Sequence, residues 1–230
     1  MPLPEDALEA IPEDVPAYGV DAATREALLR LRNRYRFALQ EISTRVDILK
    51  QEFETMHEYS PIHHVSERVK SLDSILCKSQ RRGLSLTIET IRESVRDIVG
   101  IRVSCSFMKD IYRVAGMLVQ QDDLEVVEYK DYIEHPKQSG YRSLHFIVLV
   151  PVHLSDRVER MYVEVQLRTV AMDFWASLEH KIYYKYDNDV PEHLLEELRS
   201  VAGDVDRLDR RMEYIHGQMQ ERKLTDWLES

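Results

Sequence analysis

Residues 21–59 contain no Gly and no Pro, and their apolar side chains recur at steps of three and four positions. Such spacing places apolar side chains along one side of an α-helix. The series consists of Leu28, Leu31, Tyr35, Leu39, Ile42, Val46, Leu49, Phe53 and Met56. The pattern predicts one long amphipathic helix that ends before Pro61, and such a helix needs a broad apolar surface to pack against.

The hydrophobic pattern changes along the rest of the chain. Steps of three and four predict helices at about 64–80, 86–96, 108–121, 170–185 and 191–222. Apolar or alternating runs predict strands at 98–107, 124–133, 144–152 and 161–167. In the last strand Tyr162, Glu164 and Gln166 share one face. The order predicts an α+β fold, in which helices flank a mixed, mainly antiparallel sheet and long helices stand at both ends.

The net charge of −10 is unevenly distributed. Residues 1–30 carry a net of −5, residues 186–230 a net of −6, and residues 31–185 a net of +1. A nucleotide site in the middle is therefore compatible with the charge, whereas broad binding to duplex nucleic acid is disfavoured. We expect a flexible acidic leader at 1–20, a single domain at 21–222 and a tail at 223–230.

Several features indicate a cytoplasmic protein without a membrane partner. The chain has no apolar run of about 18 residues, which a membrane-spanning helix would need. Its start lacks the basic and apolar parts of a signal peptide. The two cysteines, Cys77 and Cys105, are too few for a disulfide framework.

Two carboxylates on predicted strands are candidates for metal binding. Asp97 opens the strand in RDIVGIR, and Glu164 lies within VEVQLR. On neighbouring strands, the pair could hold Mg²⁺, which accepts one or two protein oxygens together with substrate phosphates. The alternative is that both pair with the nearby arginines, Arg96, Arg102 and Arg168.

Positive charge is concentrated in the stretch SERVKSLDSILCKSQRR, residues 66–82, which has a net charge of +3. It contains Arg68, Lys70, Lys78, Arg81 and Arg82. A triphosphate requires such a concentration, because Arg binds two oxygens at once and Lys acts as a point charge. A solvated helix surface would show the same composition.

The segment PKQSGYRSLH, residues 136–145, combines a turn signal with basic and aromatic groups. Gly140 allows a sharp turn, after which Tyr141 would be held out as a stacking platform for a base. Lys137 and Arg142 could then meet phosphates. On these residues alone, an ordinary polar hairpin turn explains the segment equally well.

The motifs ERVKS…CKSQRR, RDIVGIR, YKDYI, HPKQSGYRSLH, VEVQLRT and MDFWASLEHKIYYK follow one another in this order. Together they resemble the synthetase domain of the RelA/SpoT family, and in particular its stand-alone small alarmone synthetases. The resemblance covers about residues 25–215. It implies a nucleotidyltransferase-like fold without a hydrolase domain. It also implies transfer of the β,γ-pyrophosphate of ATP to the 3′-hydroxyl of GDP or GTP, which gives AMP and ppGpp or pppGpp.

The resemblance also implies a role for each matched residue. Asp97 and Glu164 would be the catalytic pair that holds Mg²⁺. ATP would be bound by Arg68 and Arg102 around the adenine and by Lys70, Lys78 and Arg81 near the phosphates. GDP or GTP would be bound by Lys130, Lys137, Gly140, Tyr141, Arg142, His145, Gln166 and Asp173, with Tyr141 stacked on guanine.

Relatives of this kind are commonly homotetramers, so we expect parts of the apolar stripes at 21–59 and 192–222 to form an oligomer interface. An effector such as pppGpp or RNA is also compatible with the resemblance. The main alternative function is a catalytically silent module of the same fold that binds nucleotides or RNA. A nucleotidyltransferase that adds NMP to RNA ends is disfavoured, because the chain lacks paired acidic residues after a Gly-Ser turn.

Overall fold

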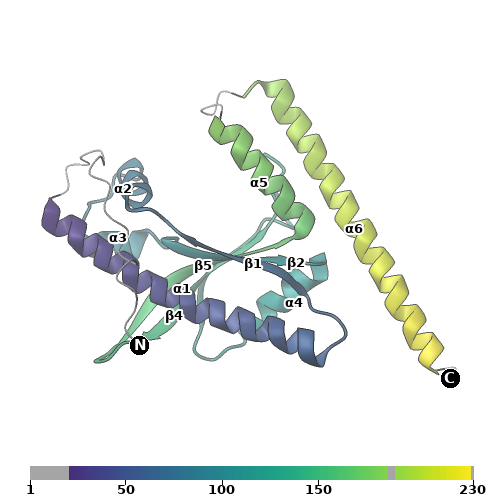
Figure 1. Ribbon diagram of the computed structural model, residues 1–230. Coiled ribbons are helices and arrows are strands. Elements are labelled where there is room, and N and C mark those ends of the chain that lie inside the picture. Colours follow the sequence, from purple (N-terminus) through teal and green to yellow (C-terminus); the bar gives the residue numbers. More distant parts are fainter. Residues whose placement is uncertain (1–20, 186–189, 229–230) are drawn as a thin grey trace.

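The structure is a computed structural model that describes residues 21–185 and 190–228. The expected leader at 1–20 lies outside the described residues. The elements in the described ranges are a five-stranded sheet and helices on its faces and flank (Figure 1).

The predicted long N-terminal helix is confirmed as α1 (Ala22–Met56). It begins at Asp21, whose carboxylate accepts a hydrogen bond from the Thr24 amide at 2.6 Å. Most of its apolar stripe, including Tyr35, Ile42 and Val46, is fully buried against the sheet. α1 therefore uses its stripe mainly for the core of its own chain, and Met56 at the end is the exposed exception.

The sheet is mixed and mainly antiparallel, as predicted. Its strands are β1 (Ile62–Val69), β2 (Val99–Cys105), β3 (Glu125–Asp131), β4 (Leu144–His153) and β5 (Val158–Thr169). Their order is β1-β2-β5-β4-β3, and only the β2–β5 pair is parallel. Residues 161–167 alternate as expected: the apolar series of β5 is buried, and Glu164 and Gln166 are half-buried on the opposite face.

The prediction of a helix over 64–80 is wrong in its first half. That segment forms β1, which pairs with β2 so that Arg68 lies opposite Gly100, and then α2 (Leu72–Arg81). Val65, Val69, Leu72 and Leu76 are three or four positions apart, so the strand and the helix together imitate one helical stripe. Ser71 marks the real boundary, because its hydroxyl caps α2 by accepting the Ser74 amide.

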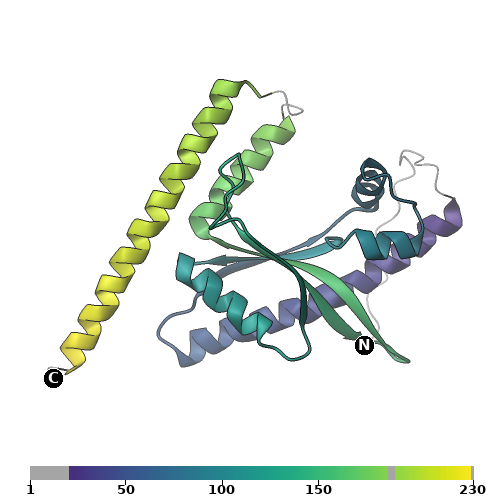
Figure 2. The ribbon, with the colours of Figure 1, turned by 180° about the vertical axis from the view of Figure 1, so that it is seen from behind.

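The remaining helices are α3 (Ile88–Ser94), α4 (Met108–Val119), α5 (Val170–Lys185) and α6 (Glu192–Leu228). α6 continues past the expected end at 222, so much of the expected tail at 223–230 is helical. The buried residues of α1 and α4 belong to one core cluster with the apolar face of the sheet, whereas α5 and α6 lie at one flank (Figures 1 and 2). Within the described ranges, no helix is long and apolar enough to cross a membrane.

Candidate active site

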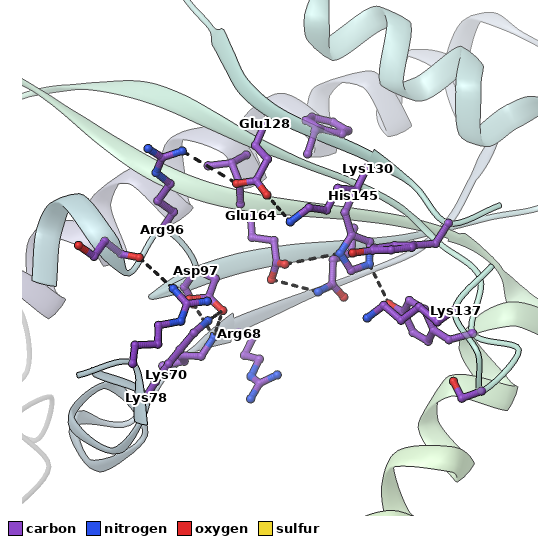
Figure 3. Close-up of a pocket in the computed structure, with 18 of the residues that line it drawn as sticks. Arg68, Lys70, Lys78, Arg96, Asp97, Glu128, Lys130, Lys137, His145 and Glu164 are labelled. Carbon is purple, nitrogen blue, oxygen red and sulfur yellow. Dashed lines mark hydrogen bonds and ion pairs between the residues drawn. The ribbon is translucent and has the colours of Figure 1, made fainter. Parts of the chain in front are cut away.

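The polar face of the sheet carries a cleft of about 760 Å³. Strands β4 and β5 contribute to its lining, and side chains from α2 and from the segment between β3 and β4 surround it (Figure 3). Ten of the predicted site residues line it, namely Arg68, Lys70, Lys78, Asp97, Lys130, Lys137, Tyr141, His145, Glu164 and Gln166. The fold thus brings together residues that are almost a hundred positions apart in the chain.

Asp97 lies just before β2, where two lysines converge on its carboxylate. Lys70 donates to Asp97 Oδ2 at 2.6 Å, and Lys78 from α2 donates to the same oxygen. Burial would raise the pKa of Asp97, but the hydrogen bonds from the two lysines outweigh it and hold the pKa below its usual range. The other oxygen, Oδ1, is buried without a hydrogen-bond partner.

Glu164 lies opposite Gly100 in the parallel β2–β5 pair, which places it on the strand next to Asp97. Its carboxylate accepts a hydrogen bond from Gln166 Nε2 at 3.0 Å and faces His145 Nδ1 at 3.6 Å. Burial raises the pKa of Glu164, but the interaction with His145 outweighs it, so the net pKa is lowered. The carboxylate is therefore ionised at neutral pH.

His145 connects Glu164 to Tyr141. Its Nε2 atom is 2.8 Å from the Tyr141 hydroxyl, and Arg168 donates to that same hydroxyl. Burial lowers the pKa of His145 below its usual value, and the nearby Glu164 opposes the shift. The network is consistent with a neutral imidazole that accepts from Tyr141 and directs Nδ1–H toward Glu164.

The arginine alternative for the two carboxylates does not hold among the described residues. Arg96 faces Glu128 at 4.0 Å, and Arg102 and Arg168 both face Asp173, at 3.4 and 3.0 Å. The partners of Asp97 and Glu164 are instead lysine, histidine and glutamine. Both carboxylates consequently remain at the cleft surface.

Residues 136–143, here called the acceptor loop after the role that the resemblance implies, make the sharp turn predicted at Gly140. This glycine has φ +89°, and its amide donates to the Lys137 carbonyl at 2.8 Å. Tyr141, however, is only 9% exposed, which contradicts the expected exposed platform. Its ring packs in a cluster with Trp175, Ala176 and Ala202, because α5 and α6 cover the loop from behind.

Tyr141 still lines the cleft, and it does so together with Tyr132. The Lys137 ammonium lies 4.6 Å from the centre of each tyrosine ring. The two rings are T-shaped, with centroids 6.1 Å apart. Sequence reasoning missed Tyr132, although its place in YKDYI beside the loop was a usable signal.

A second hollow of about 230 Å³ adjoins the cleft near β1 and β2. Arg68 and Arg102 both line it, together with Asp97 and Glu164. These two arginines come from neighbouring strands, since Arg68 pairs with Gly100 in the β1–β2 ladder. The hollow therefore places both predicted adenine-binding arginines at one site.

Four predicted residues do not line the two hollows. Arg81 is exposed at the end of α2, and its neighbour Arg82 lines the cleft instead, where it donates to the Ser94 carbonyl at 3.1 Å. Gly140 faces Ala202 of α6, and Arg142 Nη1 lies 3.0 Å from Asp206 Oδ1 of the same helix. Asp173 bridges Arg102 and Arg168.

Sequence reasoning also missed the part played by Arg168. This side chain is buried, and its guanidinium donates to Tyr141, Gln166 and Asp173. Its hydrogen bonds therefore connect β5 to the acceptor loop and to α5. From the sequence, the alternation along β5 could have indicated only that Arg168 lies on the face opposite the apolar one.

Comparison with known proteins agrees with this geometry. The model of the region found in RelA / SpoT proteins matches residues 67–189. GTP pyrophosphokinase YwaC of Bacillus subtilis (strain 168) is 49% identical over 178 residues, which cover 77% of this chain and 85% of the relative.

Two solved structures of small alarmone synthetase 1 from Bacillus subtilis are also similar. The structure bound to its product pppGpp has a TM-score of 0.79 at 36% identity and covers 84% of this chain and 98% of its own. The structure bound to AMPCPP has a TM-score of 0.73 at 35% identity, with coverages of 85% and 99%.

Proposed function

This chain belongs to the RelA/SpoT family, and we propose that it is a GTP pyrophosphokinase that makes ppGpp or pppGpp from ATP and GDP or GTP. One observation carries the proposal. Basic side chains and aromatic side chains line opposite sides of the same cleft, and Asp97 and Glu164 lie between them. The basic side suits a triphosphate donor, and the aromatic side suits a purine acceptor. The names of the relatives supply the reaction class.

In this reaction the acceptor 3′-oxygen attacks the β-phosphorus of ATP. The bond from that phosphorus to the oxygen bridging to the α-phosphorus breaks, AMP leaves, and the 3′-hydroxyl loses its proton. Transfer of this kind depends on positioning and on charge stabilisation more than on covalent participation by protein groups. The cleft residues supply both.

On the donor side, Arg68 and Arg102 would flank the adenine in the smaller hollow. Lys70 and Lys78 would meet the phosphates from the positions in which they now bind Asp97. Burial lowers the pKa of Lys70, and the hydrogen bond to Asp97 opposes this shift. Asp97 thereby helps to keep a cation in place for the incoming triphosphate.

On the acceptor side, Tyr141 and Tyr132 offer ring surfaces at the cleft wall, and Lys137 lies next to both. Guanine would stack against this pair, while Lys137 and Lys130 would meet the acceptor phosphates. His145 and Gln166 would orient Glu164 from either side. The roles of Arg81, Arg142 and Asp173 as direct nucleotide contacts have no support from the geometry of the cleft.

Magnesium is part of the proposal, and the residues present fit it. Asp97 Oδ1 is buried without a hydrogen-bond partner, and Glu164 is ionised on the neighbouring strand. The described residues contain no cluster of three or more metal-binding side chains, which suits a cation that takes its other ligands from substrate phosphates and water. When bound, Mg²⁺ would neutralise charge on the transferred group.

The lowered pKa of Glu164 bears on the proton of the 3′-hydroxyl. A lowered pKa keeps the carboxylate ionised and available as a cation ligand, and it makes the carboxylate a weaker general base. We therefore assign Glu164 chiefly to the cation. Acceptance of the proton by Glu164 itself stays a secondary prediction.

The test is incubation of the purified chain with Mg²⁺ and one or both nucleotides. AMP should form only when ATP is present together with GDP or GTP, and EDTA should stop it. Tight RNA binding without AMP formation would instead support the silent module. Comparing initial rates for the two acceptors would decide between GDP and GTP.

Assembly, location and regulation belong to the same proposal. We infer a homo-oligomer, expected to be a tetramer, built on the apolar side chains that α6 exposes. A cytoplasmic location agrees with a reaction that consumes ATP and GTP. Control by pppGpp or RNA stays a prediction that activity measurements with each effector would test.

A further inference from the structure

The C-terminal helix α6 contacts the back of the acceptor loop, on the side away from the cleft. A side chain at Gly140 would place its Cβ atom 2.5 Å from the Cβ atom of Ala202, so the loop and the helix approach too closely for anything but glycine. Arg199 of α6 also donates to the Gln138 carbonyl at 3.1 Å. The shape of the loop therefore depends on an element more than fifty residues away in the sequence.

In addition to these contacts, one charged pair joins the acceptor loop to α6. Arg142 Nη1 lies 3.0 Å from Asp206 Oδ1, with the two side chains only 21% and 16% exposed. The geometry is that of an ion pair rather than a hydrogen bond, because that carboxylate oxygen lacks an aligned donor. Arg142 Nη1 also donates to the Ile133 carbonyl at 3.1 Å, just after β3.

Arg142, which lies in the acceptor loop, therefore connects that loop both to the segment just after β3 and to α6. The residues on either side of Arg142, which are Tyr141 and Ser143, are also held by contacts with other elements. The Tyr141 ring packs on Ala202, and the Ser143 hydroxyl donates to the Leu167 carbonyl at 3.1 Å. A guanidinium held in this way is directed away from the cleft that Tyr141 lines.

We propose that Asp206 is a positioning residue for the acceptor nucleotide, which acts by holding Arg142 and through it the acceptor loop. The proposal rests on the proposed function, because it names the device that aligns the GDP or GTP subsite. It assigns Arg142 to this pair rather than to a substrate phosphate. The donor subsite, built from β1, α2 and β2, has no part in the pair.

The experiment compares the full chain with Asp206→Asn, which removes the charge and keeps the shape. The Michaelis constant for the acceptor should rise roughly three- to tenfold, as for other coupled contacts, while the Michaelis constant for ATP and the melting temperature stay close to those of the parent. Asp206→Glu, which keeps the charge, should recover part of the loss. Asp206 also pairs with Arg210 of α6, at 3.0 Å. Asp204→Asn is the matched control, because exposed Asp204 pairs with Arg207 of the same helix.

A double-mutant cycle separates a positioning role of Arg142 from a direct phosphate contact. If Arg142 acts through Asp206, Arg142→Gln should add little to the effect of Asp206→Asn. Fully additive losses, an unchanged acceptor constant, or equal losses for both substrates would overturn the proposal. If the parent formed no AMP, that result would refute the proposed function but not the positioning role of Asp206. Equilibrium binding of GDP to the same variants would still test the positioning role.

Discussion

Asp97 illustrates how one residue can serve two states of the site. Its carboxylate is bound to both Lys70 and Lys78, so one negative charge offsets part of the repulsion between two positive charges. A triphosphate would offer both lysines better partners and release the carboxylate for a cation. The arrangement explains why a half-buried carboxylate is stable beside a cleft meant for polyanions.

Replacing Asp97 by Asn should lower the rate of AMP formation about hundredfold or more at saturating nucleotides, because the cation loses a charged ligand. The variant should keep the circular dichroism spectrum of the parent. Asp156→Asn serves as the control, since Asp156 is exposed, pairs with Arg157 and is not among the residues that line the cleft. Full turnover by the Asp97 variant would refute the metal assignment.

Asp209 is a buried carboxyl of α6 whose titration should affect stability. Its Oδ2 atom accepts a hydrogen bond from Thr169 at 2.6 Å. Burial raises its pKa to about 6, above the ordinary value of 3.8, although Thr169 opposes the shift. The folded state thus retains the proton more strongly than the unfolded state, and the resulting stability is lost as the pH rises from about 4 to about 6.

We therefore expect Asp209→Asn to melt at a higher temperature than the parent at pH 8 and to show no such advantage near pH 4. The amide keeps an oxygen that can accept from Thr169. Melting curves across this pH range check the expectation, with Asp204→Asn as the comparison. If the melting temperatures of the variant and the parent differed equally at both pH values, ionisation of Asp209 would not destabilise the folded state.

At the scale of elements, the helices and strands with clean periods were predictable, and the segment around β1 was not. α1 and β5 each bury one regular face, so their patterns survive in the sequence. β1 is an edge strand whose two faces are both partly exposed, and its alternation is correspondingly weak. A local pattern cannot separate such a strand from the helix that follows it.

The same contrast holds for α6 and for the cleft. Periodicity found the apolar stripe of α6, but the residues that attach α6 to the domain are small or charged, such as Ala202, Asp206 and Asp209. In the cleft, motifs identified ten of the twenty lining residues. Burial of Tyr141, the direction of Arg142 and the use of Arg82 in place of Arg81 depend on long-range packing, which motifs do not describe.

Gly140→Ala should disturb the contact between the acceptor loop and α6. The new Cβ atom would meet Ala202, and the backbone has a φ of +89° that an L-residue rarely adopts. We expect weaker GDP binding and a melting temperature lower by a few degrees. Adding Ala202→Gly should restore only part of the loss, because it removes the clash and leaves the strained backbone.

Gly217→Ala is the matched control for this substitution. Gly217 lies within α6 with open space around its Cβ position, so alanine should stabilise the helix by up to about 1 kcal/mol. If Gly140→Ala bound GDP as tightly as the parent, close approach of α6 would not shape the loop. Calorimetry on both variants measures binding and melting together.

At the scale of the whole molecule, α6 presents two different faces. One packs on the domain, and the other exposes Leu208, Met212, Ile215 and Met219, each about half accessible or more. A run of exposed apolar side chains along one helix is typical of a protein interface. Since α1 buries most of its own stripe in the core, the expected oligomer interface falls mainly on α6.

Leu208→Lys combined with Ile215→Lys should therefore lower the molar mass in solution. Two lysines on the stripe would place like charges within a symmetric interface. Gln218→Lys, which lies off the stripe, should leave the mass unchanged. Light scattering after size-exclusion chromatography distinguishes the species, and an unchanged mass for the double variant would exclude this face as the interface.

The most direct test of the proposed function follows the phosphates of ATP. The chain is incubated with Mg²⁺, GDP and ATP that carries radioactive phosphorus at the β position, and the products are separated. The account predicts that the label moves to a guanosine nucleotide while unlabelled AMP forms in equal amount. Label found in ADP or free phosphate, or retained in ATP, would contradict it.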